Sequence, residues 1–402
     1  MDLRRSQEEL AFRAEVRRFL DASLPRELRY HNDGAYHSTR EETLAWQRIL
    51  FERGWAAPHW PKVHGGTGWT AEQRLIFDIE CAAAGAPWIN QQGMGLLGPV
   101  VNAFGTPEQK ERFIPALLRG DIYWCQGFSE PGSGSDLASL RTAARQDGDR
   151  YFVSGQKIWT SHAHHADWIF MLVRTAKGAR KQEGISFMAA PMNTPGITVR
   201  QIDCIDGLEH LCEVFFDEVE IPAHNVIGEP GQGWAIAKHL LENERVSGAC
   251  DLPGMLRDLG RLKRAIVVPS RGGRTALDEP AFAYRLARVS MEAEAAIMSY
   301  LNAIATDNPS TAEHPEIGNI LKVKVTELHQ KVVELLFDVL GDRGPLFYPS
   351  PMHADEFPPE PLPGLDLDLA SAASEIMYRR GVSIHGGTNE IQREIIAKAV
   401  FG

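Results

Sequence analysis

The stretch Trp124-Cys-Gln-Gly-Phe-Ser-Glu-Pro-Gly-Ser-Gly-Ser-Asp136 says more about the fold than any other part of this 402-residue chain. Two distant segments share its character: Gly155-Gln-Lys-Ile-Trp-Thr-Ser161 and Ile384-His-Gly-Gly-Thr-Asn-Glu-Ile-Gln-Arg393. Each offers backbone N–H groups and hydroxyls in a turn-rich setting, because glycine permits tight turns whose N–H groups face outward. Such segments suit a phosphate or a flavin ring better than a packed core.

The glycines of Gly132-Ser-Gly-Ser135 superficially match a dinucleotide-binding fingerprint. The third glycine of that fingerprint is missing, and the surrounding sequence does not predict a βαβ unit. A Rossmann domain is therefore a poor interpretation of this stretch.

Composition and charge narrow the class of protein. A chain of 402 residues has room for two or three domains with cores of their own, and 44% hydrophobic with 24% charged residues is ordinary for a globular protein. No run approaches the about 18 apolar residues of a membrane span, and the N-terminus has no apolar signal core, so we expect no membrane span. The net charge of −11 disfavours nucleic acid as a partner. Five scattered cysteines without C-x-x-C favour a reducing cytoplasm.

The hydrophobic period changes twice along the chain. Residues 1–118 predict a helical domain, in which Phe12, Val16 and Leu20 form one helix face and Thr106 caps another helix. Residues 119–228 predict short strands separated by turns, with Asp147-Gly148 as a hairpin signal, and therefore a small antiparallel, barrel-like β domain. Residues 229–402 return to helices, interrupted by a proline-rich loop between residues 344 and 364.

This helix–sheet–helix order and the three quoted segments resemble the acyl-CoA dehydrogenases, which desaturate an acyl thioester between its α and β carbons. The resemblance covers essentially the whole chain and implies an α+β fold with FAD as cofactor. It is greatest for the bacterial branch that acts on steroid or other bulky acyl-CoA thioesters. It places Ser135 and Lys398 near the CoA part of the substrate, and it implies the following flavin contacts: Gln126, Phe128, Ser129, Trp159, Ser161, Arg271, Thr388 and Glu390.

The catalytic base is the most specific implication of the resemblance. Many members carry a glutamate just before the Gly-Thr pair of the C-terminal segment, where this chain has Gly386. Other members place the base on the first helix of the C-terminal domain, just before an arginine, and here those positions are Glu244 and Arg245. Helical periodicity agrees, because Glu244 continues the stripe of Ala237, Leu240 and Leu241.

The same resemblance gives Gly386 a role that needs no side chain. Its backbone N–H would hold the thioester oxygen while Glu244 takes the α-proton and the β-hydride passes to flavin N5. An electron-transfer flavoprotein is then the expected acceptor, and the assembly a homotetramer or an α2β2 heterotetramer.

Two alternatives stay open. The chain could be a catalytically incomplete, FAD-binding partner subunit, because Gly386 replaces a glutamate and the family's R-x-x-F-G segment is not recognisable. It could also be an oxidase or monooxygenase of the same fold. The histidines of Ser161-His-Ala-His-His165 lack an acidic partner at ligand spacing, so we expect no metal there.

Overall fold

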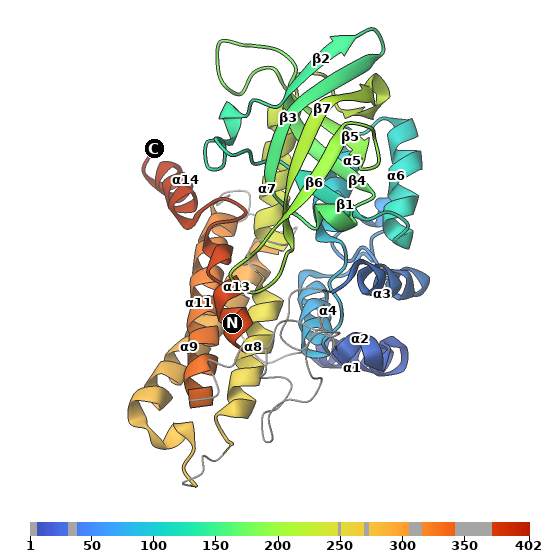
Figure 1. Ribbon diagram of the computed structural model, residues 1–402. Coiled ribbons are helices and arrows are strands. Elements are labelled where there is room, and N and C mark those ends of the chain that lie inside the picture. The colour runs from blue at the N-terminus through green and yellow to red at the C-terminus, as the bar shows by residue number, and fades with distance from the viewer. Residues whose placement is uncertain (1–5, 31–37, 248–250, 269–272, 305–315, 342–371) are drawn as a thin grey trace.

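Amphipathic helices form the N-terminal part of the computed structural model, which describes residues 6–30, 38–247, 251–268, 273–304, 316–341 and 372–402 (Figure 1). The predicted face of the first helix is confirmed, since Phe12, Val16 and Leu20 are all buried. Thr106 caps its helix as predicted, in a capping box with Gln109. The elements are α1 (Gln7–Ser23), α2 (Arg26–Tyr30), α3 (Arg40–Arg53), α4 (Ala71–Ala83), the π-helical turn η2 (Gln92–Leu97), α5 (Gly98–Phe104) and α6 (Pro107–Arg119).

A single sheet forms the middle of the chain, in the order β6-β7-β3-β2-β4-β5-β8, with β1 paired to β4. The predicted hairpin at Asp147-Gly148 is confirmed by the antiparallel β2–β3 pair. The sheet is not antiparallel throughout, because β1 runs parallel to β4 from Trp124 to Gly127. The strands are β1 (Trp124–Gly127), β2 (Ala143–Asp147), β3 (Arg150–Ser161), β4 (Trp168–Arg174), β5 (Ile185–Pro191), β6 (Ile197–Ile202), β7 (Leu211–Pro222) and β8 (Val226–Ile227).

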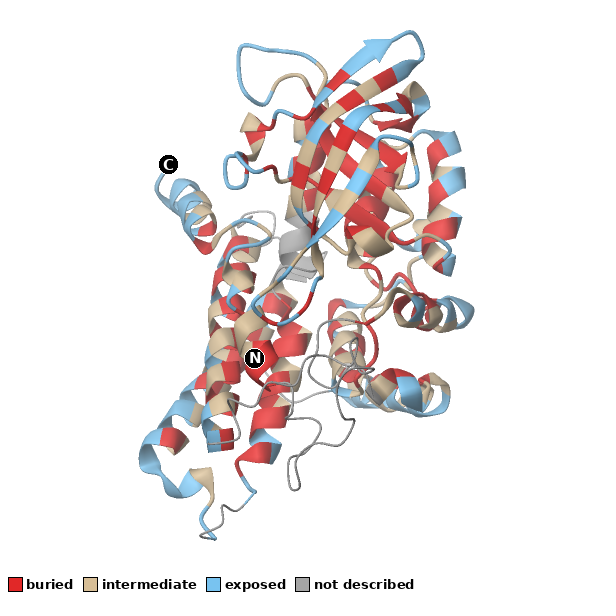
Figure 2. Cartoon of the chain, viewed as in Figure 1, coloured by how far each residue is buried: buried red, intermediate tan, exposed pale blue. Residues whose placement is uncertain are grey.

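Long helices form the C-terminal part. Helix α7 packs against β5 and η2, so it ties the sheet to the N-terminal helices, and α8 is the next described helix of the chain (Figure 1). Figure 2 shows that much of α8 and α11 is buried, whereas α14 projects from the body and is largely exposed. The helices are α7 (Gly233–Ser247), α8 (Leu252–Ala265), α9 (Pro280–Ile304), α11 (Ile317–Leu340), α13 (Ala372–Tyr378) and α14 (Asn389–Phe401).

The core is divided among the three parts and continuous across their junction. One apolar cluster joins η2, α5 and α6 with the inner faces of β1, β4 and β5 and with α7. A second joins α8, α9 and α11 with α4. No helix in the described ranges combines the length and the apolar character needed to cross a membrane. The predicted proline-rich loop and Arg271 lie outside the described residues.

Candidate active site

The segment after β1 is fixed at its start by Asn90. The amide of Asn90 donates to the carbonyl of Trp124 and accepts from its N–H, both at 3.0 Å. Beyond this point Gln126 and Ser129 are half-buried, and Phe128 is buried. The N–H of Ile158 donates to the carbonyl of Ser129 at 2.9 Å. The structure therefore brings residues 126–129 beside β3, as the two quoted segments require if they share a ligand.

A buried ion pair lies between these two segments. The Nζ of Lys157, which is fully buried, lies 2.8 Å from Oε1 of Glu130 and donates to the carbonyl of Phe128 at 3.2 Å. Glu130 also accepts the N–H groups of Arg141 and Thr142, at 2.6 and 2.9 Å. Burial lowers the pKa of Lys157 to about 8. Burial acts to raise the pKa of Glu130, but the charge of Lys157 and these hydrogen bonds outweigh it and leave that pKa below its ordinary value.

Sequence patterns do not predict this pair. Both residues stand inside the quoted segments, but pairing two positions 27 residues apart requires the fold. A lysine followed by apolar residues within a strand was the available signal, since an inward-facing lysine is rarely buried without a partner.

Trp159 departs from the regular strand. It has a positive φ of 61°, at an irregularity in the β3–β7 register between Lys157 and Thr160. Its side chain is 56% exposed, which is unusual for a large aromatic residue within a sheet. Next to it, the buried hydroxyl of Thr160 has no hydrogen-bond partner within the described chain. The half-buried Ser161 pairs with Leu211 at the end of the strand.

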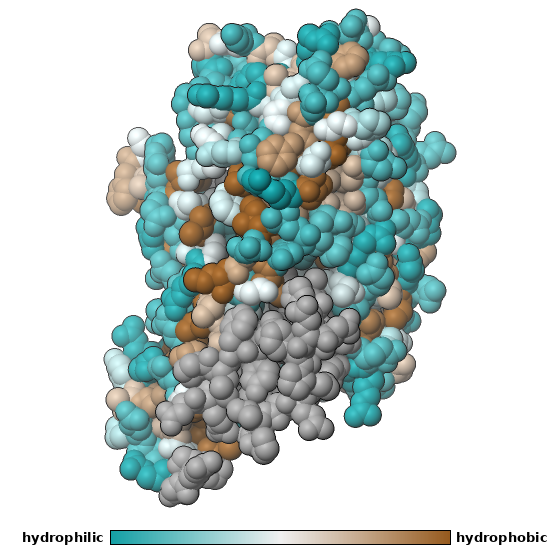
Figure 3. Space-filling model, in the orientation of Figure 1, coloured by the Kyte–Doolittle hydropathy of each residue, from teal (hydrophilic) through white to brown (hydrophobic). Residues whose placement is uncertain are grey.

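The sheet meets the C-terminal helices beside this point. The N–H of His162 donates to the carbonyl of His210 at 2.7 Å, and the ring of His210 lies edge-on to Tyr378 of α13 at 5.6 Å. The Ser374 hydroxyl donates to the carbonyl of Asp206 at 2.8 Å. Apolar side chains gather on this face where the sheet meets the helices, above the grey region of Figure 3.

The third quoted segment turns into the N-terminus of α14. Gly386 and Gly387 have φ values of 66° and 85°, and both carbonyls accept from the amide of Gln392. Thr388 caps the helix by accepting the N–H of Ile391 at 3.3 Å. Within the residues described, the N–H of Gly386 has no hydrogen-bond partner. The segment is held against α11, because the Nζ of Lys322 donates to Oδ1 of Asn389 at 3.0 Å.

The other predicted site residues are either exposed or have side chains outside the described residues. Ser135 is exposed on the loop after β1, and Glu390 is exposed in the first turn of α14. Lys398 is exposed near the end of α14 and pairs with Glu394. Glu244 and Arg245 lie on α7, but their side chains are outside the described part of the structure.

A large cavity adjoins this region. It has a volume of about 430 Å³ and lies between α3, α4, η2 and the start of α8. Gln91 of its wall is next in sequence to Asn90, the residue that holds β1. Asp251, also in the wall, comes shortly after α7 in the sequence. The aromatic residues that line it are Trp46, Trp55, Trp60, Phe77, Trp88 and Tyr300.

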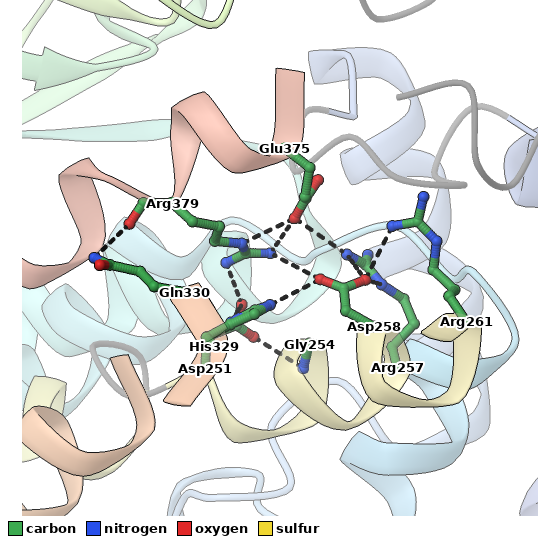
Figure 4. A network of polar contacts seen from close by, with 9 residues as sticks. All are labelled: Asp251, Gly254, Arg257, Asp258, Arg261, His329, Gln330, Glu375 and Arg379. Carbon is green, nitrogen blue, oxygen red and sulfur yellow. Dashed lines mark hydrogen bonds and ion pairs between the residues drawn. The ribbon is translucent and has the colours of Figure 1, made fainter. Parts of the chain in front are cut away.

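A buried network of charges fixes the start of α8 beside that cavity (Figure 4). Arg379 pairs with Asp251 at 2.8 Å and with Glu375 at 2.7 Å, and His329 approaches Asp258 to 2.7 Å. Burial lowers the pKa of His329, so three carboxylates face three guanidinium groups and a neutral imidazole. The balance of charge explains how so many ionic groups stay buried. The network comprises Asp251, Arg257, Asp258, Arg261, His329, Glu375 and Arg379.

Known families match the chain along almost its whole length. Three family models fit it: acyl-CoA dehydrogenase N-terminal domain at residues 6–121, middle domain at 125–219 and C-terminal domain at 231–401. The chain is 37% identical over 396 residues to acyl-CoA dehydrogenase IpdE1 of Mycobacterium tuberculosis, covering 97% of both chains. It is 35% identical to IpdE1 of Mycolicibacterium smegmatis, again covering 97% of both.

Solved structures give the same result. The structure described as the Tcur3481-Tcur3483 steroid ACAD superposes with a TM-score of 0.83 and 29% identity, covering 99% of this chain and 98% of that one. The ChsE4-ChsE5 complex of Mycobacterium tuberculosis superposes with a TM-score of 0.80 and 29% identity, covering 100% and 99%.

Proposed function

The chain belongs to the acyl-CoA dehydrogenase family, whose members are FAD-dependent oxidoreductases, and from this premise we propose that it desaturates an acyl-CoA thioester between the α and β carbons with Glu244 as base. Residues 1–118, 119–228 and 229–402 are then its three domains. The observation that supports the proposal most is the N–H of Gly386, just before α14, which has no hydrogen-bond partner among the described residues.

The described residues fit FAD in two respects. The exposed ring of Trp159 offers a flat apolar contact to a flavin ring. The N-terminus of α14 offers free N–H groups and the positive end of a helix dipole, which suit the phosphates of a cofactor. Bound FAD supplies the acceptor for the two electrons that leave the substrate. The residues that would hold it are Gln126, Phe128, Ser129, Trp159, Ser161, Thr388 and Glu390, and Arg271 stays a prediction.

The base is assigned to α7 because of the face that this helix buries. Ile236, Ala237 and Leu240 are fully buried against the sheet and η2. Glu244 follows Leu240 by one helical turn and therefore continues the same stripe. A glutamate at this position of the helix is therefore our candidate for the group that takes the α-proton.

Gly386 assists by holding the thioester oxygen. Removing the α-proton places negative charge on that oxygen, and a fixed N–H donor stabilises it by about 3 kcal/mol in comparable sites. The N–H of Gly386 makes no hydrogen bond among the described residues, and its carbonyl is held by the amide of Gln392. The donor therefore does not depend on a glutamate side chain at this position.

The acyl group is proposed to be bulky. The aromatic cavity of about 430 Å³ is in the range of pockets that bind drug-sized ligands, and the chain resembles a structure described as a steroid ACAD. Ser135, Arg245 and Lys398 are proposed to contact the CoA portion.

Exchange of the α-proton tests the role of Glu244 separately from electron transfer. The FAD-loaded protein is incubated with a bound acyl-CoA in D2O, and incorporation of deuterium at the α carbon is followed by mass spectrometry. We expect Glu244→Gln to lose exchange by at least a hundredfold, whereas Glu242→Gln, about 200° round the helix, keeps it. Equal exchange in the two variants would refute the assignment of the base.

A second candidate function is that of an FAD-binding partner subunit without a complete site. It is favoured by the names of two similar structures, Tcur3481-Tcur3483 and ChsE4-ChsE5, each of which pairs two different chains. Purification of this chain alone separates the two candidates, because a partner subunit would not turn over any acyl-CoA by itself. The proposed acceptor is an electron-transfer flavoprotein, and the proposed assembly is a homotetramer or an α2β2 heterotetramer.

A further inference from the structure

One face of α4 forms a wall of the large cavity. Arg74, Phe77, Asp78, Cys81 and Ala82 follow a helical spacing of three and four residues, and all of them line the space. A wall that contacted only hydrocarbon would be apolar along this stripe. Here it carries Asp78 and Arg74 in a cavity that tryptophan residues also line, which indicates that the occupant is not purely apolar.

The carboxylate of Asp78 is paired in a way that leaves it able to accept. The Nε2 of His59 lies 3.0 Å from one oxygen, Oδ2, and both residues line the cavity. The side chain of Asp78 is 21% exposed and that of His59 is 31% exposed, so a ligand in the cavity can reach both. A carboxylate has acceptor sites on both oxygens, and one imidazole does not saturate them.

Gln91 supplies a donor to the same space. Its amide nitrogen is buried and has no hydrogen-bond partner among the described residues, although Gln91 lines the cavity. The side chain lies close over Gly95, where a Cβ atom would come within 2.2 Å of that nitrogen. A buried donor without a partner costs about 1–3 kcal/mol, and a ligand acceptor would remove that cost.

Other polar groups of the cavity wall are already engaged. The indole N–H of Trp60 donates to the carbonyl of Met94 at 2.8 Å. Asp251 is held by Arg379 and by the N–H of Gly254. By contrast, Asp78 and Gln91 keep unused hydrogen-bonding capacity in the same wall.

We propose that Asp78, His59 and Gln91 recognise an oxygen substituent, a hydroxyl or a ketone, on the ring end of the acyl group, remote from the thioester. This inference rests on the proposed function, because it deepens the substrate class of the same site. A hydroxyl donates to the free acceptor sites of Asp78 and accepts from Gln91, whereas a ketone can only accept. The recognition selects among bulky acyl groups by their oxygen pattern.

Two matched thioesters test the inference: lithocholoyl-CoA, which carries one ring hydroxyl, and cholanoyl-CoA, which lacks it. Both are given anaerobically to the FAD-loaded full-length protein, and flavin bleaching yields kcat/KM while titration calorimetry yields Kd. We expect the wild type to prefer lithocholoyl-CoA by about tenfold or more, as a hydrogen bond to a charged acceptor implies. The preference should appear in Kd and KM and not in kcat, because the contact is remote from the reacting carbons.

The variants assign that preference to particular side chains. Asp78→Asn and Gln91→Leu should each reduce the preference to about threefold or less, whereas Glu72→Gln, on the exposed face of the same helix, should keep it. Equal preference in Asp78→Asn, Gln91→Leu and the wild type would overturn the inference while leaving the proposed function intact. A wild type that neither binds nor is bleached by either thioester would overturn both.

Discussion

The buried Lys157–Glu130 pair allows a quantitative prediction about the segment that carries the flavin contacts. Replacing Lys157 by methionine keeps the volume of the side chain but leaves Glu130 buried, with 7% of its side chain exposed. Breaking a buried pair from one side typically costs 3–5 kcal/mol. Glu130 keeps two backbone N–H partners, from Arg141 and Thr142. We therefore expect the lower end, a loss of about 3 kcal/mol in the free energy of unfolding.

Urea unfolding followed by circular dichroism measures this loss, and gel filtration followed by absorbance measures the FAD that stays bound. Lys181→Met is the matched control, because Lys181 pairs with Asp136 of the same loop but both side chains are more than half exposed. That variant should lose less than about 1 kcal/mol. If Lys157→Met unfolded at the same urea concentration as Lys181→Met, the reasoning about the buried pair would be wrong.

The double variant Lys157→Met/Glu130→Gln separates charge from hydrogen bonding. It removes the uncompensated carboxylate but leaves an amide oxygen to accept one of the two N–H groups. We expect it to be more stable than Lys157→Met alone by about 1 kcal/mol. A double variant less stable than Lys157→Met would show that the charge of Glu130 is satisfied without Lys157.

Three further perturbations have expected outcomes. Arg379→Met removes the arginine that pairs with the buried Asp251 and Glu375, and it should lower the unfolding free energy in urea by about 3–5 kcal/mol. The neighbouring exposed Arg380→Met should cost less than about 1 kcal/mol, and similar losses in the two variants would contradict the burial argument. Burial lowers the pKa of His210 to about 4, whereas in the unfolded state the imidazole takes up a proton near pH 6.5. The free energy of unfolding should therefore fall by up to about 3 kcal/mol as the pH drops from 6.5 to 4. Denaturation titrations of His210→Gln should lack this component, and a pH profile equal to that of the wild type would refute it. Thr388→Ala should speed amide exchange at the start of α14 about fivefold while Thr388→Ser does not, because the cap contributes about 1 kcal/mol.

The sequence predicts local structure well where the signal itself is local. The buried face of α1 and the cap at Thr106 depend on residues three or four apart, and both are confirmed. The sequence patterns did not predict helix α8. Its apolar positions Leu252, Met255, Leu259 and Leu262 have helical spacing, but Pro253 stands among them and suggests a break. Since Asp251 caps the helix, that proline occupies the first turn, where it is tolerated.

Contacts between distant residues could not be predicted in the same way. The parallel pairing of β1 with β4 joins residues 44 apart, from Trp124 to Trp168. The partner of Asp251 is Arg379, which is 128 residues away. Composition and periodicity carry no information about such pairs, because the partner of each residue is set by the path of the chain and not by its neighbours in sequence.

The candidate site shows the same division. Quoted segments identify Gly386 and Trp159, but the unpartnered N–H of the first and the exposed ring of the second are visible only in the fold. The side chain of Glu244 lies outside the described residues, so its role stays a prediction.

The visible spectrum of the chain, purified alone with FAD and titrated anaerobically with a panel of acyl-CoAs, tests the central claim most directly. We predict a flavin band that bleaches on addition of a bulky acyl-CoA and that persists in Glu244→Gln with the same thioester bound. A protein that binds FAD but is bleached by none of the thioesters would contradict a self-sufficient dehydrogenase and would favour the partner-subunit function.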